Sequence, residues 1–87
     1  MTEIENKLIN IIKHCDNSLD TKDINSKTDL VNDLGFDSIS IIQLVVELEN
    51  EFDIEIDDEY LLIEYLSPFK SLIEIINNSI NAKMKRN

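Results

Sequence analysis

Near the start of the chain, apolar residues recur at the three- and four-residue intervals that place them on one face of an α-helix. The pattern runs from Ile4 to Cys15. Thr2 and Glu5 have the spacing of a capping box, in which side chains bond to backbone amides at the start of a helix. We therefore predict a first helix that ends near Asn17, with Cys15 as a small buried side chain rather than a reactive thiol.

A second helix is predicted over residues 39–52, which contain no glycine or proline. At about 100° per residue, one set of apolar residues falls on a face that would point to a core. This core face consists of Ile41, Leu44, Val45, Leu48 and Phe52. Ile39, Ile42 and Val46 fall on roughly the opposite face. A small bundle cannot readily bury both faces, so this second stripe is either covered by loop residues or exposed to a partner.

The pattern is weaker after residue 52. Asp57 or Asp58 is expected to cap a short third helix through residues 60–63. Ser67 and Pro68 then signal the start of a last helix, with the serine as cap and the proline in the first helical position. This helix is expected to end near residue 81, and its apolar face consists of Phe69, Leu72, Ile73, Ile76 and Ile80.

A long polar stretch, residues 18–36, joins the first two helices, and isolated apolar residues are expected to anchor it to the core: Leu19, Ile24, Leu30, Leu34 and Phe36. The elements together predict an all-α fold. It is a small four-helix bundle with three longer helices, a short third helix and a long loop between helices 1 and 2. A chain of this length supports one core, so we expect a single domain over residues 1–87. The bundle would cover about 3–81, followed by a basic tail, 82–87, without fixed structure.

Charge is unevenly distributed along the chain. The net charge is −10, and no lysine or arginine lies between Lys27 and Lys70, where twelve of the eighteen acids fall. This sign disfavours nucleic acids and anionic lipid surfaces, and no apolar run resembles a signal peptide or a membrane span. A single cysteine suits a reducing compartment, so we expect a cytoplasmic monomer. The acids either attract basic partners or simply keep the surface solvated.

The stretch 33–39 combines a turn, a cap and a hydroxyl group. Gly35 is the only glycine and signals a turn, Asp37 can cap the second helix, and Ser38 stands where that helix begins. Unpaired amides and the helix dipole make such a position favourable for an attached phosphate. Ser38 has no G-x-S-x-G elbow, and the single histidine, His14, leaves little from which to build a catalytic triad or a metal site. We therefore expect no catalytic residues and no bound metal.

The segment DLGFDSISIIQLVVELENEF, residues 33–52, resembles the signature of acyl carrier proteins. In that signature an Asp-Ser-Leu triad opens the second helix and a Leu-Glu-x-x-Phe pattern closes it, and the likeness extends by pattern over about residues 4–80. The resemblance implies a free-standing, non-catalytic carrier. A phosphopantetheinyl transferase would use coenzyme A to esterify Ser38 with 4′-phosphopantetheine, beside Gly35, Asp37 and Ile39. The thiol of this arm would carry acyl groups as thioesters between the enzymes of fatty-acid, polyketide or other specialised biosynthesis.

The same resemblance implies two further sets of residues. One set would dock basic-surfaced acyl-transfer, ketosynthase or ligase enzymes, and consists of Asp37, Ile39, Ile42, Gln43, Val46, Glu47 and Glu49. The other would line a pocket for the acyl chain, and consists of Val45, Leu48, Ile54, Leu62 and Leu66.

The chain departs from the family pattern at several positions. Ile39 replaces the usual leucine, and Ser40 and Gln43 stand where fatty-acid carriers commonly have acids. Gln43 is similar to the residue of D-alanine carriers, so a D-alanyl or aminoacyl carrier is an alternative. The stretch 52–69 is longer and more apolar than usual, which suggests an unusual cargo. An acidic protein-interaction module without a prosthetic group is a more distant alternative.

Overall fold

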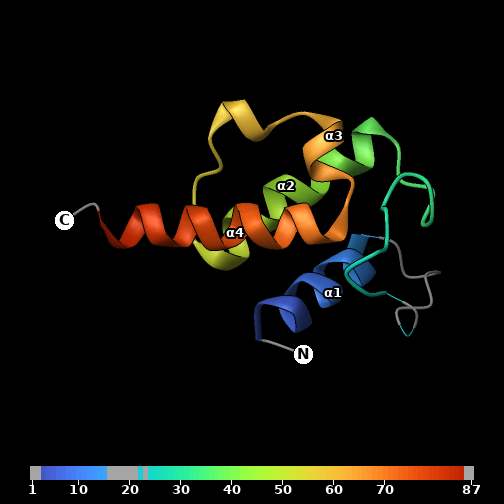
Figure 1. The fold of residues 1–87 in the computed structure, drawn as a ribbon, viewed down its shortest axis with the longest axis horizontal. Helices are drawn as coiled ribbons and strands as arrows, with labels where there is room; N and C mark the ends of the chain where they lie inside the picture. Colours follow the sequence, from blue (N-terminus) through green and yellow to red (C-terminus); the bar gives the residue numbers. More distant parts are fainter. Residues whose placement is uncertain (1–2, 16–21, 23, 86–87) are drawn as a thin grey trace.

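A computed structural model describes residues 3–15, 22 and 24–85 of the chain. These residues form helices and loops without a β-strand, which confirms the predicted all-α class (Figure 1). In chain order the elements are α1 (Glu3–Cys15), α2 (Ser38–Phe52), the 3₁₀-helix η2 (Asp58–Tyr60), α3 (Ile63–Leu66) and α4 (Phe69–Met84).

The core lies where α1, α2 and α4 meet, and α3 packs against α2 and α4. Each long helix contributes one apolar face, as the spacing of its apolar residues predicts. The largest fully buried helical side chains are Leu8 and Ile12 of α1, Ile41, Leu44 and Leu48 of α2, and Phe69, Leu72 and Ile76 of α4. Within the described ranges, none of the helices is long and apolar enough to cross a lipid bilayer.

The described part of the first loop is anchored to the core as predicted. Ile24, Leu30 and Phe36 are buried, and Leu34 is half-buried. The predicted anchor at Leu19 lies outside the described residues, as do the predicted cap at Thr2 and the predicted helix end near Asn17.

The predicted short third helix is confirmed, but its predicted position, residues 60–63, was wrong. The chain instead forms η2, continues through Leu61 and the extended Leu62, and then forms the single turn of α3. The side chain of Asp57, which precedes η2, makes no capping hydrogen bond. Leu66 is the only buried residue in η2 and α3. A longer helix here would therefore have no continuous buried face to stabilise it.

The predicted cap at Ser67 was also wrong. Pro68 occupies the cap position of α4 and has no side-chain hydrogen bond to offer. The Ser67 side chain is buried and bonds instead to residues 29–31 of the first loop.

α4 continues past the predicted end of the bundle at Asn81. It reaches Met84, so residues 82–84 are helical and do not belong to a tail without fixed structure. Lys83 lies in the last turn and its Nζ is 2.6 Å from Oδ2 of Asp53, which follows α2. A lysine at this end also interacts favourably with the helix dipole. Residues 86–87 of the predicted tail lie outside the described residues.

Candidate functional site

Ser38 is the first residue of α2, and its side chain is exposed. The preceding residue, Asp37, has an extended backbone, and its Oδ1 accepts a hydrogen bond of 2.8 Å from the backbone N–H of Ser40. This confirms the predicted cap and satisfies one of the amides that a helix leaves free at its N-terminus. The bond from the Ser40 backbone is the main reason that the pKa of Asp37 is lowered, so this carboxylate is ionised at neutral pH.

The turn before α2 fixes where Ser38 lies. Gly35 has φ +76°, a left-handed conformation that disfavours any residue with a Cβ atom. Its N–H donates to the carbonyl of Val31 over 3.2 Å, and the N–H of Phe36 donates to the carbonyl of Leu30 over 2.9 Å. Because the Phe36 ring is buried, the chain enters α2 from a point held by the core.

A polar network ties this turn to the junction between α3 and α4. The Ser67 hydroxyl donates to Oδ1 of Asp29, and the N–H of Leu30 donates to the Ser67 carbonyl over 2.7 Å. The same Asp29 oxygen accepts from the N–H groups of Val31, over 3.0 Å, and Asn32, over 2.9 Å. The Asn32 amide first, and then the Ser67 hydroxyl, lower the pKa of Asp29.

Sequence reasoning missed this network, although it supports the site. Asp29 and Ser67 are 38 positions apart, and no local spacing connects them. The position of Ser67 directly before Pro68 suggested only a helix cap. Nothing in the pattern of a single chain could have found the pair.

Ser38 is not placed like a catalytic nucleophile. Within the described residues its hydroxyl makes no hydrogen bond to another side chain, and no group of three metal-ligating side chains occurs. His14 lies on a groove between α1 and α2 that Ser38 does not line. Cys15 lines the same groove, and burial first, then the Glu47 carboxylate, raise the pKa of its thiol. The arrangement offers an exposed hydroxyl for another protein to modify.

The second stripe of α2 is exposed rather than covered by the loop. The exposed fractions are 66% for Ile39, 62% for Ile42 and 50% for Val46. Gln43 and Glu47, which lie beside the stripe, are exposed as well. The structure therefore brings an apolar stripe, its polar neighbours and Ser38 together on one helix.

Glu49 differs from the other residues of the predicted docking set. It is half-buried, and its Oε2 accepts a hydrogen bond of 3.0 Å from the N–H of Ile56. This bond holds the segment after α2 against the helix. Glu49 therefore helps to stabilise the fold, and its carboxylate is less available to a partner than the exposed carboxylate of Glu47.

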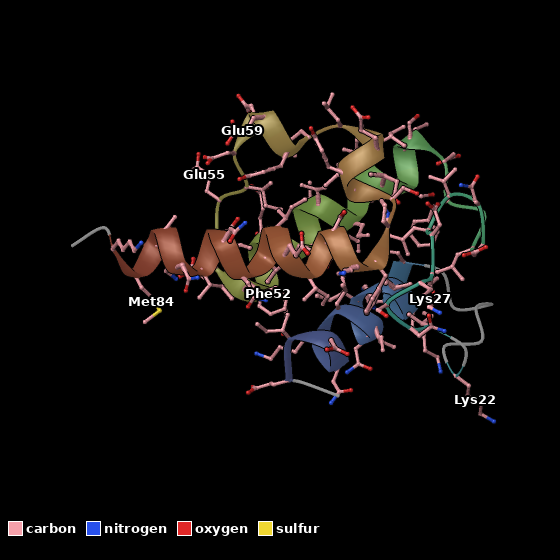
Figure 2. The ribbon with its side chains drawn as sticks, in the orientation of Figure 1. Lys22, Lys27, Phe52, Glu55, Glu59 and Met84 are labelled. Carbon is pink, nitrogen blue, oxygen red and sulfur yellow. The ribbon has the colours of Figure 1, made fainter. Side chains whose placement is uncertain are left out.

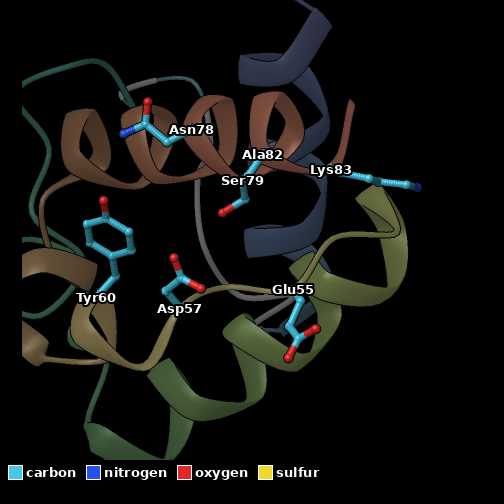
Figure 3. Close-up of a pocket in the computed structure, with 7 residues that line it drawn as sticks. All are labelled: Glu55, Asp57, Tyr60, Asn78, Ser79, Ala82 and Lys83. Carbon is cyan, nitrogen blue, oxygen red and sulfur yellow. The ribbon is translucent and has the colours of Figure 1, made fainter. Parts of the chain in front are cut away.

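The residues that the resemblance assigns to an acyl pocket lie mostly in the core. Val45, Leu48, Ile54 and Leu66 are packed in the core, whereas Leu62 is 49% exposed. A cavity of about 210 Å³ lies instead between the segment after α2 and the second half of α4 (Figure 3). Most of its lining residues are of polar types, and they are Glu55, Asp57, Tyr60, Asn78, Ser79, Ala82 and Lys83. None of the predicted pocket residues lines this cavity, and the acyl pocket stays a prediction.

Comparison with known proteins adds independent evidence. Residues 6–75 match a family model described as phosphopantetheine attachment site. A protein named acyl carrier protein from Buchnera aphidicola subsp. Schizaphis graminum is 38% identical over 78 residues, which cover 90% of this chain and 95% of that protein. Another of the same name, from Desulforapulum autotrophicum, is 38% identical over 56 residues, which cover 64% of this chain and 73% of that protein.

Proposed function

This chain belongs to the acyl carrier protein family, and from that premise we propose that Ser38 is the residue that carries its 4′-phosphopantetheine. Members of the family are carriers and not catalysts, and phosphopantetheine is their prosthetic group. The thiol of the arm supplies the chemistry, because it holds acyl groups as thioesters. The chain's own residues present, orient and expose the attachment point.

The observation that carries this proposal is the setting of Ser38. Its exposed hydroxyl stands at the first position of a fifteen-residue helix, where backbone N–H groups and the helix dipole favour a phosphodiester. Asp37 satisfies the amide of Ser40 without covering the hydroxyl. Gly35 and Phe36 hold the start of the helix in place, so an enzyme meets Ser38 in a fixed position.

The partners are enzymes that reach Ser38. A phosphopantetheinyl transferase with coenzyme A would load the arm, and basic-surfaced acyl-transfer, ketosynthase or ligase enzymes would use it. The exposed stripe of Ile39, Ile42 and Val46 supports docking along α2, with Glu47 able to pair with a lysine or arginine. We place this carrier, as a monomer, in the cytoplasm.

The cargo we propose is an acyl group of fatty-acid or specialised biosynthesis, such as polyketide assembly. A D-alanyl or aminoacyl cargo is the second candidate, and exposed Gln43 beside the docking stripe favours it. Mass spectrometry of the chain isolated from its own cells separates the two. A hydroxylamine-labile acyl mass supports the first candidate, and a labile alanyl mass the second.

Attachment is tested by incubating the purified chain with coenzyme A, magnesium and a broad-specificity phosphopantetheinyl transferase. We expect mass spectrometry to find one added phosphopantetheine. Ser38→Ala should abolish the gain, and Ser40→Ala, which alters a neighbouring hydroxyl and keeps the backbone bond to Asp37, should retain it. A chain that gains no mass would favour an acidic interaction module, and a gain that survives Ser38→Ala would refute the assignment of Ser38.

A further inference from the structure

The cavity between the segment after α2 and the second half of α4 has no part in the presentation of Ser38. Ser38 does not line it, and its lining includes three polar side chains that could hold a ligand: Asp57, Tyr60 and Ser79. From this cavity we propose a binding site for a small organic ammonium ion. The site is separate from the attachment point, and the inference does not depend on the modification of Ser38.

Ser79 is the most deeply buried polar residue of the cavity. It is 8% exposed, and its side chain makes no hydrogen bond to another described residue. In the described part of the chain, no polar side-chain atom that is sealed from its surroundings lacks a partner, so the Ser79 hydroxyl is reached from the cavity. Figure 3 shows this hydroxyl directed into the space below α4. A buried hydroxyl without a partner in its own chain is paired by water or by a ligand.

Asp57 and Tyr60 line the opposite side of the cavity. The Asp57 side chain makes no capping hydrogen bond to η2, and Figure 3 shows its carboxylate directed toward α4. Tyr60 packs against the core, and its ring forms one side of the space. A carboxylate, a hydroxyl group and an aromatic ring together suit an ammonium ion, because it has three N–H donors and a positive charge.

The charge of the lining selects a cation. Glu55 and Asp57 both line the cavity, and neither forms an ion pair with a described residue. Glu55 projects away from α4, so it adds negative charge at the rim (Figure 2). Lys83 is the one basic residue in the lining, but its Nζ lies 2.6 Å from Oδ2 of Asp53 and points away from the cavity (Figure 3). An anion would therefore be repelled.

The cavity suits an organic ion better than a metal. Across the described ranges, no three histidine, cysteine, aspartate or glutamate side chains are grouped so that they could hold a metal ion. Benzene fits a cavity of about 150 Å³, so 210 Å³ has room for roughly six to nine non-hydrogen atoms. A short diamine, 1,4-diaminobutane, is of this size and has one ammonium group for each lining carboxylate. We choose it as the probe.

Isothermal titration calorimetry of the full chain with 1,4-diaminobutane, at pH 7 and physiological salt, tests the inference. We expect a single site. Asp57→Asn should raise the dissociation constant about tenfold or more, because it removes a charged acceptor, and Ser79→Ala should raise it about threefold to tenfold. Glu59→Gln is the matched control. It removes one charge from the same segment, but Glu59 does not line the cavity and projects away from α4 (Figure 2). Its dissociation constant should equal that of the wild type.

The diol 1,4-butanediol, which has hydroxyl groups in place of the ammonium groups, should not bind. Far-UV circular dichroism checks that each variant is folded. Four results would overturn the inference: no binding of the diamine at millimolar concentration, equal binding of the diol, equal losses in Asp57→Asn and Glu59→Gln, or displacement of the diamine by micromolar magnesium or calcium. Ser38→Ala should bind the diamine as the wild type does, so this inference and the proposed attachment at Ser38 can fail separately.

Discussion

Replacing Ser67 with alanine tests how the fold holds the start of α2. The Ser67 hydroxyl is buried, and it joins the α3–α4 junction to the Asp29 carboxylate in the turn that leads to Ser38. Ser67→Ala deletes this hydrogen bond, and the longer one of 3.3 Å that the Ser67 hydroxyl accepts from the N–H of Val31, without adding bulk. Leu30 keeps its bond to the carbonyl of residue 67, because that bond involves only backbone atoms.

The loss of unfolding free energy in Ser67→Ala depends on which hydrogen bonds the remaining groups keep. A hydrogen bond to a charged group contributes roughly 1.5–3 kcal/mol net. Asp29 keeps two backbone donors, and Val31 keeps the Asp29 oxygen as acceptor, so no buried polar group is left unpaired. The better helix propensity of alanine at the end of α3 offsets up to about 0.5 kcal/mol. We therefore expect a loss of about 1–2 kcal/mol, which corresponds to a melting temperature lower by roughly 5–15 °C.

Urea denaturation at pH 7, followed by far-UV circular dichroism, measures this loss. The matched control is Ser71→Ala, which removes a half-buried serine in the first turns of α4. It should leave the free energy of unfolding unchanged or slightly higher. If Ser67→Ala proves as stable as the control, the bond to Asp29 contributes nothing, and our account of how the turn is held is incorrect.

The same bond predicts how the effect depends on pH. The pKa of Asp29 is lower in the folded chain than its ordinary value of 3.8. Stability from such a group is fully present above the unfolded pKa and is lost as the pH falls through the folded pKa. The difference between wild type and Ser67→Ala should therefore hold from pH 7 to about pH 5 and shrink below about pH 4. A difference that grew on acidification would contradict the assigned ionised acceptor.

Three further substitutions have clear expectations in the same urea assay. Gly35→Ala should lower the free energy of unfolding by about 1 kcal/mol, because φ +76° strains a residue with a Cβ atom, even though the added Cβ would meet no other atom within 4 Å. An unchanged free energy of unfolding would contradict the left-handed turn. Leu44→Ala should cost about 2–5 kcal/mol, since this side chain is fully buried, and a cost below 1 kcal/mol would place it outside the core. Lys83→Ala should leave the urea midpoint unchanged, because its ion pair with Asp53 is exposed on both sides, and a clear shift would show that the pair stabilises the end of α4.

The spacing of apolar residues predicted the long helices, because each long helix has one apolar face that is buried in the core. In α2 it separated Ile41 and Leu44, which are buried, from Ile39 and Ile42, which are not. It could not decide whether the loop would cover the second stripe. The path of a loop depends on contacts between distant residues, and spacing within a helix carries no information about them.

The two errors have different physical causes. Ser67 was interpreted as a cap because serine before proline satisfies a local rule, but a half-buried carboxylate from the first loop accepts its hydroxyl hydrogen bond. The short helix was placed over residues 60–63 because these residues are apolar, yet Leu61, Leu62 and Ile63 are exposed. A tertiary contact overrode the local preference at Ser67, whereas residues 60–63 lack the continuous buried face that would stabilise a helix.

α2 has two apolar faces, of which one is buried in the core and the other is exposed. Burial of Leu44 stabilises the folded chain whether or not a partner is bound. Ile42 is exposed, so it could contribute to the free energy of binding only when a partner covers it. Under the docking proposed for the exposed stripe, substitutions there would alter which enzymes bind without weakening the bundle. Ser38 is the first residue of the same helix, so the proposed attachment point would stay in place while the stripe changes.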